Sequence, residues 1–257
     1  MATINDRWLI SIGTSHPWNI AGIGLDARVA AHYDLPHAAV IAAVSAQDGR
    51  GVRALEAVSP AMLQAQLDAL PATEGAYRIG ALPDAHSVRT VARYLRKTAE
   101  GTPIVVDPVL RASLGGQLHR DADVPDAVLA EFCACGAIFT PNIDEAAQLC
   151  GLDVRDEPAM ERAGRMLVER GARAALITGG HLEGDPVDLL VTRSGVRRLS
   201  GPRLPGSMRG AGCTLAASLA CRLALGIDPA QAAADAHAFV RARIAAGIVR
   251  DGLQVAF

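Results

Sequence analysis

Short apolar runs alternate with longer amphipathic segments along nearly the whole chain. Short runs bounded by glycine, proline and polar residues are typical of buried strands, whereas apolar residues at every third or fourth position are typical of helices. This alternation predicts βαβ units, and therefore an α/β fold with a mostly parallel sheet and helices on both faces. We expect strands at 8–12, 38–44, 77–82, 102–106, 137–139 and 174–177, and helices at 22–33, 85–99, 124–133, 143–149 and 158–170, with one more helix opened by Ser59-Pro60.

A hairpin is predicted late in the chain, where Arg193-Ser194-Gly195 separates two apolar runs at 187–192 and 196–200. Such a hairpin adds antiparallel strands to one edge of the sheet. Two helices, at 214–225 and from Pro229 to about Ile248, complete the expected elements. Because no repeat and no Pro-, Gly- or Ser-rich linker divides the sequence, we expect residues 1–257 to form a single domain.

The composition narrows the class of protein. Half of the residues are hydrophobic but only 4% are aromatic, so alanine, valine and leucine must build most of the core. A net charge of −2 without a basic run argues against binding to nucleic acid or to an acidic membrane. The apolar stretches are too short to span a bilayer, and the start lacks the pattern of a signal peptide. Five cysteines suit a reducing compartment, so we expect a cytoplasmic protein in which Cys133 and Cys135 pack rather than bind metal.

Polar residues follow almost every strand that is expected to be parallel. In sheets of this kind, ligands bind beyond the carboxyl ends of the strands. Each residue also has a purely structural explanation: Asp107 precedes a proline and could form a turn, and Asn142 and Glu145 have the spacing of a capping box. Their coincidence on one rim nevertheless favours a ligand site. The candidates are Gly13, Thr14, Ser15, His16, Ser45, Gln47, Asp48, Arg50, Asp107, Asn142, Glu145, Thr178, Gly179, Gly180 and His181.

A loop of small residues runs directly into the apolar helix expected from Thr214. Residues 207–214 read S-M-R-G-A-G-C-T. Backbone N–H groups at a helix start, left accessible by glycine and alanine, form an anion site. A titratable side chain, Cys213, lies within it, and this combination indicates phosphoryl transfer. The structural alternative is a simple tight turn before a helix.

Six segments, in chain order, resemble the motifs of one family. Residues 21–26 (A-G-I-G-L-D) resemble A-G-I-Q-A-D, residues 45–52 (S-A-Q-D-G-R-G-V) resemble V-A-Q-N-T-R-G-V, and residues 106–109 read V-D-P-V. Residues 140–146 (T-P-N-I-D-E-A) resemble T-P-N-x-x-E-A, residues 179–181 resemble the end of K-G-G-H, and residues 210–214 (G-A-G-C-T) resemble G-T-G-C-T. These are motifs of the hydroxymethylpyrimidine/phosphomethylpyrimidine kinases in the ribokinase-like superfamily.

The resemblance implies a ribokinase-like three-layer fold and transfer of the ATP γ-phosphate to an alcohol. In this family the acceptor is the hydroxymethyl group of 4-amino-5-hydroxymethyl-2-methylpyrimidine, or the monophosphate of that compound, in thiamine biosynthesis. The implied cofactors are ATP and Mg²⁺, and the implied assembly is a homodimer. A pyridoxal-type kinase on the same fold is the alternative enzyme, and a ligand-binding relative with weak turnover is the non-enzymatic alternative.

By the same resemblance, the backbone of Gly210, Ala211 and Gly212 cradles the transferred phosphoryl group. Cys213 would then take or orient the proton of the acceptor alcohol. Because Cys213 stands at a helix start, its pKa is expected to be lowered in favour of the thiolate.

The resemblance also assigns the remaining sides of the site. Asp107 and Glu145 are expected to hold Mg²⁺, partly through water, as suits that ion. An amide and a carboxylate can read adjacent donors and acceptors of an aminopyrimidine ring. The implied substrate residues are Gly13, Asp26, Gln47 and Val109, and the implied ATP residues are Asn142, Thr178 and Gly179.

Four departures from the family pattern bear on activity. The glycine-rich stretch G-S-D-x-S-G-G-A-G reads G-T-S-H-P-W-N-I-A-G at residues 13–22. The lysine of K-G-G-H is Thr178, and a second family lysine aligns with Ser113. The usual T-H before the small-residue loop is Met208-Arg209, so Arg209 is either a replacement phosphate cation or an exposed loop arginine. Loss of two lysines is the reason for keeping the weak-turnover alternative.

Overall fold

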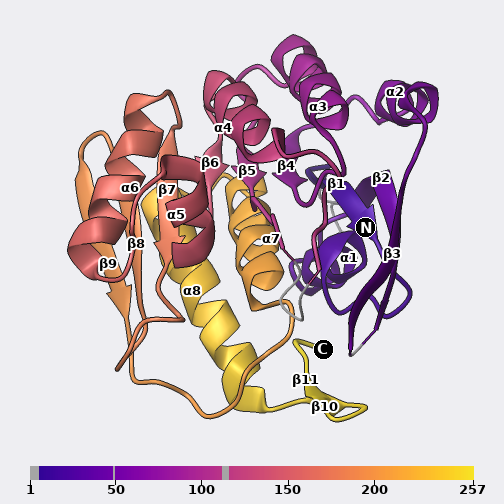
Figure 1. Ribbon diagram of the computed structural model, residues 1–257. Helices are drawn as coiled ribbons and strands as arrows, with labels where there is room; N and C mark the ends of the chain where they lie inside the picture. The colour runs from indigo at the N-terminus through magenta and orange to yellow at the C-terminus, as the bar shows by residue number, and fades with distance from the viewer. Residues whose placement is uncertain (1–5, 49, 112–115) are drawn as a thin grey trace.

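The computed structural model describes residues 6–48, 50–111 and 116–257. Its strands are β1 (Trp8–Ser15), β2 (His37–Asp48), β3 (Gly51–Ala57), β4 (Gly75–Ile79), β5 (Ile104–Val106), β6 (Ile138–Phe139), β7 (Ala174–Thr178), β8 (Val187–Thr192), β9 (Gly195–Ser200), β10 (Val249–Arg250) and β11 (Leu253–Gln254). Within the described ranges, β1 to β9 form one sheet in the order β3-β2-β1-β4-β5-β6-β7-β8-β9 (Figure 1). The strands from β2 across to β7 are parallel, while β3, β8 and β9 pair antiparallel at the two edges.

Helices cover both faces of this sheet, so the molecule has three layers (Figure 1). The helices are α1 (Gly22–His32), α2 (Pro60–Asp68), α3 (Ala85–Thr98), α4 (Val124–Ala134), α5 (Ile143–Cys150), α6 (Glu157–Glu169), α7 (Ala211–Ala224) and α8 (Pro229–Ala246). Helices α2 to α6 pack on one face, and α1, α7 and α8 pack on the other. The predicted α/β class, the two-sided helix cover and the late hairpin β8–β9 are confirmed.

Two apolar clusters form because successive residues of a strand point to opposite faces of the sheet. Ile10 and Ile79 belong to the cluster beneath α2 to α6, whereas Leu9 and Ala76 belong to the cluster beneath α1, α7 and α8. Arg78 lies two positions after Ala76 on β4 and therefore points toward α1 and α7. A buried arginine thus stands in a layer whose buried cluster is mostly alanine and aliphatic side chains.

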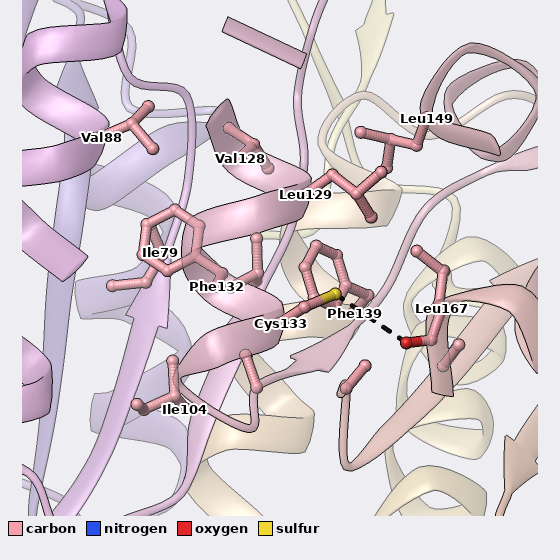
Figure 2. Packing of buried hydrophobic residues seen from close by; sticks show 14 of the residues in the cluster. Ile79, Val88, Ile104, Val128, Leu129, Phe132, Cys133, Phe139, Leu149 and Leu167 are labelled. Atoms are coloured by element: carbon pink, nitrogen blue, oxygen red, sulfur yellow. Dashed lines mark hydrogen bonds between the residues drawn. The ribbon is translucent and has the colours of Figure 1, made fainter. Parts of the chain in front are cut away.

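The first cluster is densely packed where α4 crosses the middle of the sheet. Figure 2 shows Phe132 of α4 and Phe139 of β6 among aliphatic side chains, and both rings are fully buried. The thiol of Cys133 lies beside them and donates to the carbonyl oxygen of Leu167 at 3.8 Å. Burial raises the pKa of this thiol to about 11. Cys133 therefore contributes to core packing, in agreement with the sequence analysis.

The antiparallel ribbon β2–β3 is the main element that the sequence analysis missed. Strand β2 extends to Asp48, and residues 51–57 turn back along it as β3. Gln47 and Asp48 therefore lie within a strand rather than in a loop after one. The cause is that β3 is an edge strand with a half-exposed face, so it lacks the continuous apolar run of the buried strands. The hairpin β10–β11 was also missed, because its strands are two residues long.

Helix starts follow the local signals in the sequence. The Asp84 carboxylate accepts a hydrogen bond from the backbone N–H of Ser87 at 2.7 Å, as expected for the cap of α3. At α5, the Asn142 side chain accepts from the N–H of Glu145 at 2.9 Å, and the Glu145 carboxylate accepts from the N–H of Asn142 at 3.0 Å. These two residues thus form the capping box that was their structural explanation.

Replacing the cap of α3 is expected to destabilise the fold through the loss of one hydrogen bond at the start of that helix. Asp84→Ala removes the acceptor for the Ser87 N–H and should lower the free energy of unfolding by about 1 kcal/mol. Asp153→Ala is the matched control, because Asp153 is exposed and pairs only with nearby Arg155 at 2.7 Å in the described structure. Urea denaturation compares the two variants, and equal midpoints would show that the cap carries no stability.

Candidate active site

The carboxyl ends of the parallel strands meet along one rim of the sheet. Strand β1 is followed by α1 on one face, and its neighbour β4 is followed by α3 on the other. In open α/β sheets, strands whose connections diverge in this way leave a crevice beyond their ends, and ligands bind there. Its floor is tight: a Cβ on Gly13 would lie 3.4 Å from Cα of Gly80, and the Thr14 hydroxyl donates to the carbonyl of Ala81 at 3.1 Å.

Helix α7 begins at the edge of this crevice. Gly210 is its N-cap and adopts a left-handed conformation with φ 73°. A Cβ there would overlap the carbonyl oxygen of Ile20 and stand 2.8 Å from Cδ2 of Leu25, so only glycine fits. No side chain of the described residues caps α7, and its first-turn N–H groups are available to an anion.

Gly212 in the first turn of α7 faces an open space. It is exposed, its φ is not in the left-handed region, and a Cβ placed on it would lie 3.9 Å from Oδ1 of Asp107. Glycine is therefore not required there by backbone conformation. The absent side chain instead leaves room between the helix start and the Asp107 carboxylate.

The start of α1 approaches the same point. The backbone N–H of Gly22 is close enough to the thiol of Cys213, in the first turn of α7, to favour its charged form. Helix α1 likewise lacks a side-chain cap among the described residues. Two helix N-termini therefore converge near Cys213, and their dipoles favour negative charge between them.

Arg78 is the functional residue that the sequence analysis missed. Its side chain is 1% exposed and lies between two carboxylates, with Nη1 3.4 Å from Oδ2 of Asp26 and Nη2 hydrogen-bonded to Oδ2 of Asp107. The signal was a charged residue inside the apolar strand Ala76-Tyr77-Arg78-Ile79, since a buried charge requires a partner.

Asp26, which is predicted to contact the substrate, is fully buried on α1. Burial raises the pKa of its carboxyl to about 6, although Arg78 opposes the rise. Its nearest charged partner is the guanidinium of Arg78. The contact between Asp26 and an aminopyrimidine stays a prediction.

The prediction of a Cys213 thiolate is wrong. Burial raises the pKa of the thiol to about 12, and the negative charge of Asp107 adds to the rise. These two effects outweigh Arg78 and the Gly22 N–H, which both favour the thiolate. Cys213 is therefore a neutral thiol beside the Asp107 carboxylate.

Asp107 and Glu145 bring two carboxylates to the rim. Burial, together with the smaller effect of the negative charge of Asp107, raises the pKa of Glu145 to about 8. Glu145 is half-buried at the start of α5, where its Oε2 also serves the capping box. Among the described residues no group of three or more His, Cys, Asp and Glu side chains forms a ready metal cage. A pair of carboxylates that repel each other fits Mg²⁺, which takes few protein ligands and keeps water and phosphate oxygens.

The residues expected near ATP lie together at the ends of β6 and β7. Asn142 and Thr178 form a parallel bridge, and the Thr178 N–H donates to the carbonyl of Pro141 at 2.9 Å. The next residue, Gly179, donates its N–H to Oδ1 of Asp188 at 3.1 Å. The structure thus brings these three predicted residues onto one side of the rim, next to Glu145.

The residues expected near the acceptor lie on the other side. Gln47 is opposite Val52 in the ribbon β2–β3, and Val52 packs with Val109, Ala81 and Leu118 in a small apolar cluster. Val52 thus connects the ribbon that carries Gln47 to the segment of Val109, although the two come from distant parts of the sequence.

The departures from the family pattern lie around the same rim. Arg209 is half-buried, and its backbone N–H donates to the carbonyl of Gln254 at 2.8 Å, which ties the start of α7 to β11. His16 is buried, with Nε2 3.0 Å from the carbonyl oxygen of Ala21, whereas Trp18 is 38% exposed and so lies outside the core. Ser113 lies outside the residues that the structure describes.

No helix in the described ranges is both long and apolar enough to cross a membrane.

Known proteins share this sequence pattern and this fold. A family model described as phosphomethylpyrimidine kinase matches residues 18–254. The hydroxymethylpyrimidine/phosphomethylpyrimidine kinase of Streptomyces coelicolor is 35% identical over 247 residues, which cover 95% of this chain and 91% of that protein. The relative of the same name from Rhizobium meliloti is 36% identical over 245 residues, covering 92% of this chain and 90% of that protein.

Solved structures agree. Phosphomethylpyrimidine kinase from Clostridium difficile superposes with a TM-score of 0.79 at 25% identity, covering 92% of this chain and 98% of that chain. Pyridoxal kinase from Staphylococcus aureus, in complex with ADP, superposes with a TM-score of 0.86 at 24% identity, covering 96% and 91%, a likeness that shows the ribokinase-like fold. With its motifs, its three layers and a profile match over most of its length, this chain belongs to the phosphomethylpyrimidine kinase family.

Proposed function

We propose that this protein transfers the γ-phosphoryl group of ATP to the hydroxymethyl group of 4-amino-5-hydroxymethyl-2-methylpyrimidine, and to the monophosphate of that compound. The names of the relatives support both activities. The observation that carries the proposal is the open space at Gly212, bounded by uncapped N–H groups of α7 and by Oδ1 of Asp107. That space has the donors that a transferring phosphoryl group requires.

The acceptor lies on the Gln47 side of the rim and the nucleotide on the Thr178 side. The first-turn N–H groups of α7 then lie between them and stabilise the charge that develops on the phosphoryl oxygens. Phosphoryl transfer passes through a loose transition state, so positioning and electrostatics contribute more than base strength. A neutral Cys213 thiol beside Asp107 that orients the acceptor hydroxyl suits this chemistry.

Asp107 and Glu145 are the residues that would hold Mg²⁺. When bound, the ion neutralises phosphate charge. Asn142 and Gly179 would border the nucleotide, and Thr178 provides no positive charge where the family has lysine. The N-termini of α1 and α7 therefore carry a larger share of the phosphate charge here. The homodimeric assembly, the cytoplasmic location and the single-domain organisation implied above stay predictions.

A direct assay tests the proposed function. Purified protein is incubated with Mg-ATP and the pyrimidine alcohol, its monophosphate or pyridoxal, and release of ADP is followed. We expect turnover with the alcohol and slower turnover with the monophosphate, because bulky residues replace the glycines of the family between Gly13 and Gly22. Faster turnover of pyridoxal would favour the alternative kinase. A pyrimidine that raises Tm without any ADP release would contradict both and leave a binding protein.

Substitution of each of the two glycines at the start of α7 is expected to separate an effect on catalysis from an effect on folding. Gly212→Ala should keep or raise the free energy of unfolding, by up to about 1 kcal/mol, because alanine favours helix and its Cβ meets no overlap. It should lower kcat by about 100-fold, since the methyl group stands where the phosphoryl group must pass. Gly210→Ala is the matched comparison: its positive φ and the overlap with Ile20 should destabilise the fold itself. Full activity in Gly212→Ala would show that the phosphoryl group does not occupy this space.

The raised pKa of Glu145 predicts a pH-dependent requirement for Mg²⁺. Below about pH 8 the carboxyl is largely protonated and must lose its proton to bind the ion, so the Mg²⁺ concentration for half-maximal rate should fall as pH rises from 7 to 9. Glu145→Gln should make this concentration high and independent of pH. Asp144→Asn is the control, because Asp144 is adjacent but exposed and pairs with His181 at 3.3 Å. The same pH dependence in Glu145→Gln would exclude Glu145 as its source.

A further inference from the structure

One buried guanidinium links three segments of the active site. Arg78 of β4 pairs with Asp26 of α1 and with Asp107, which follows β5. We propose that Arg78 is a positioning residue that aims the Asp107 carboxylate at the metal and the phosphoryl group. The proposal rests on the function proposed above, because it assigns Asp107 to the metal.

The two oxygens of Asp107 have different environments. Oδ2 accepts the hydrogen bond from Nη2 of Arg78 inside the protein. Oδ1 is turned toward the start of α7, 3.9 Å from the place that a Cβ on Gly212 would take. By holding one oxygen, Arg78 fixes the rotation of the carboxylate and directs the other oxygen to the open space.

The absence of a side chain at Gly80 leaves room for the guanidinium of Arg78. A Cβ on Gly80 would overlap Nη1 of Arg78 and stand 3.2 Å from its Cζ. The φ of Gly80 is not in the left-handed region, so backbone conformation does not require glycine there. The missing side chain therefore serves to admit the guanidinium beneath the rim.

Asp26 completes the arrangement on the α1 side of the guanidinium. It is fully buried, and its Oδ2 lies 3.4 Å from Nη1 in an ion pair without a hydrogen bond. Its negative charge therefore holds the guanidinium in place on that side. A planar fork can span two carboxylates in this way, whereas a lysine ammonium is a point charge that reaches one of them.

Three variants test this positioning role. Arg78→Lys keeps the charge but loses the fork. Gly80→Ala displaces the guanidinium without changing any charged residue. The double variant Asp26→Asn with Arg78→Met removes one buried charge of each sign, so the net charge of the buried group is unchanged and Asp107 is the one carboxylate of the group that loses its partner.

The control is Arg222→Met, which breaks an Arg–Asp pair far along α7, where Nε of Arg222 lies 2.8 Å from Asp235. It should lower Tm and leave kcat unchanged. Each protein is examined for Tm, for kcat and KM, and for binding of Mn²⁺ in the presence of ADP, measured by electron paramagnetic resonance. The Mn²⁺ experiment needs no acceptor, so it tests Arg78 even if the assignment of the pyrimidine substrate fails.

All three test variants are expected to weaken Mn²⁺ binding and to lower kcat by about 10-fold or more, with KM for ATP nearly unchanged. Arg78→Lys should retain the most activity, because it keeps the positive charge beside Asp107. Wild-type kcat and Mn²⁺ affinity in the folded variants would overturn the proposal, as would a loss of activity in step with Tm that Arg222→Met reproduces. Absence of Mn²⁺ binding by the wild-type protein with ADP would also overturn it.

Discussion

The backbone conformation of Gly210 determines what this site can do. With φ at 73° and no Cβ, the chain can pass directly against the carbonyl of Ile20 and enter α7 beside the ends of β1 and β5. The helix start is thereby placed next to Asp107, and its N–H groups remain uncapped. Everything chemical in the crevice depends on that approach, because neither Cys213 nor Gly212 would otherwise lie near a carboxylate.

Charge at this rim is distributed unusually for a site that handles phosphates. Two of the lysines expected from the family pattern are replaced by Thr178 and Ser113. Arg78 beneath the rim is buried and shared by Asp26 and Asp107. Peptide dipoles at the starts of α1 and α7 add positive potential that is fixed in place.

Features that depend on local patterns could be predicted from the sequence, whereas features that depend on contacts between distant segments could not. Buried strands, helix caps and the glycine-rich entry to α7 could be read from short stretches, and the capping box of Asn142 and Glu145 was found by spacing alone. Strand β3 could not be read, since only its pairing with β2 makes it a strand. The thiol of Cys213 was misjudged because the helix start is a local effect, whereas burial and the charge of Asp107 arise from the tertiary structure.

Glu145 connects the folding of α5 to the chemistry of the rim. One carboxylate both closes the capping box with Asn142 and stands near enough to Asp107 to feel its charge. Few substitutions can satisfy both demands: glutamine keeps the hydrogen bond but loses the charge, and aspartate keeps the charge but is one methylene shorter. This position thus serves both the cap of α5 and the metal site proposed above, and these two demands together limit which residues it can hold.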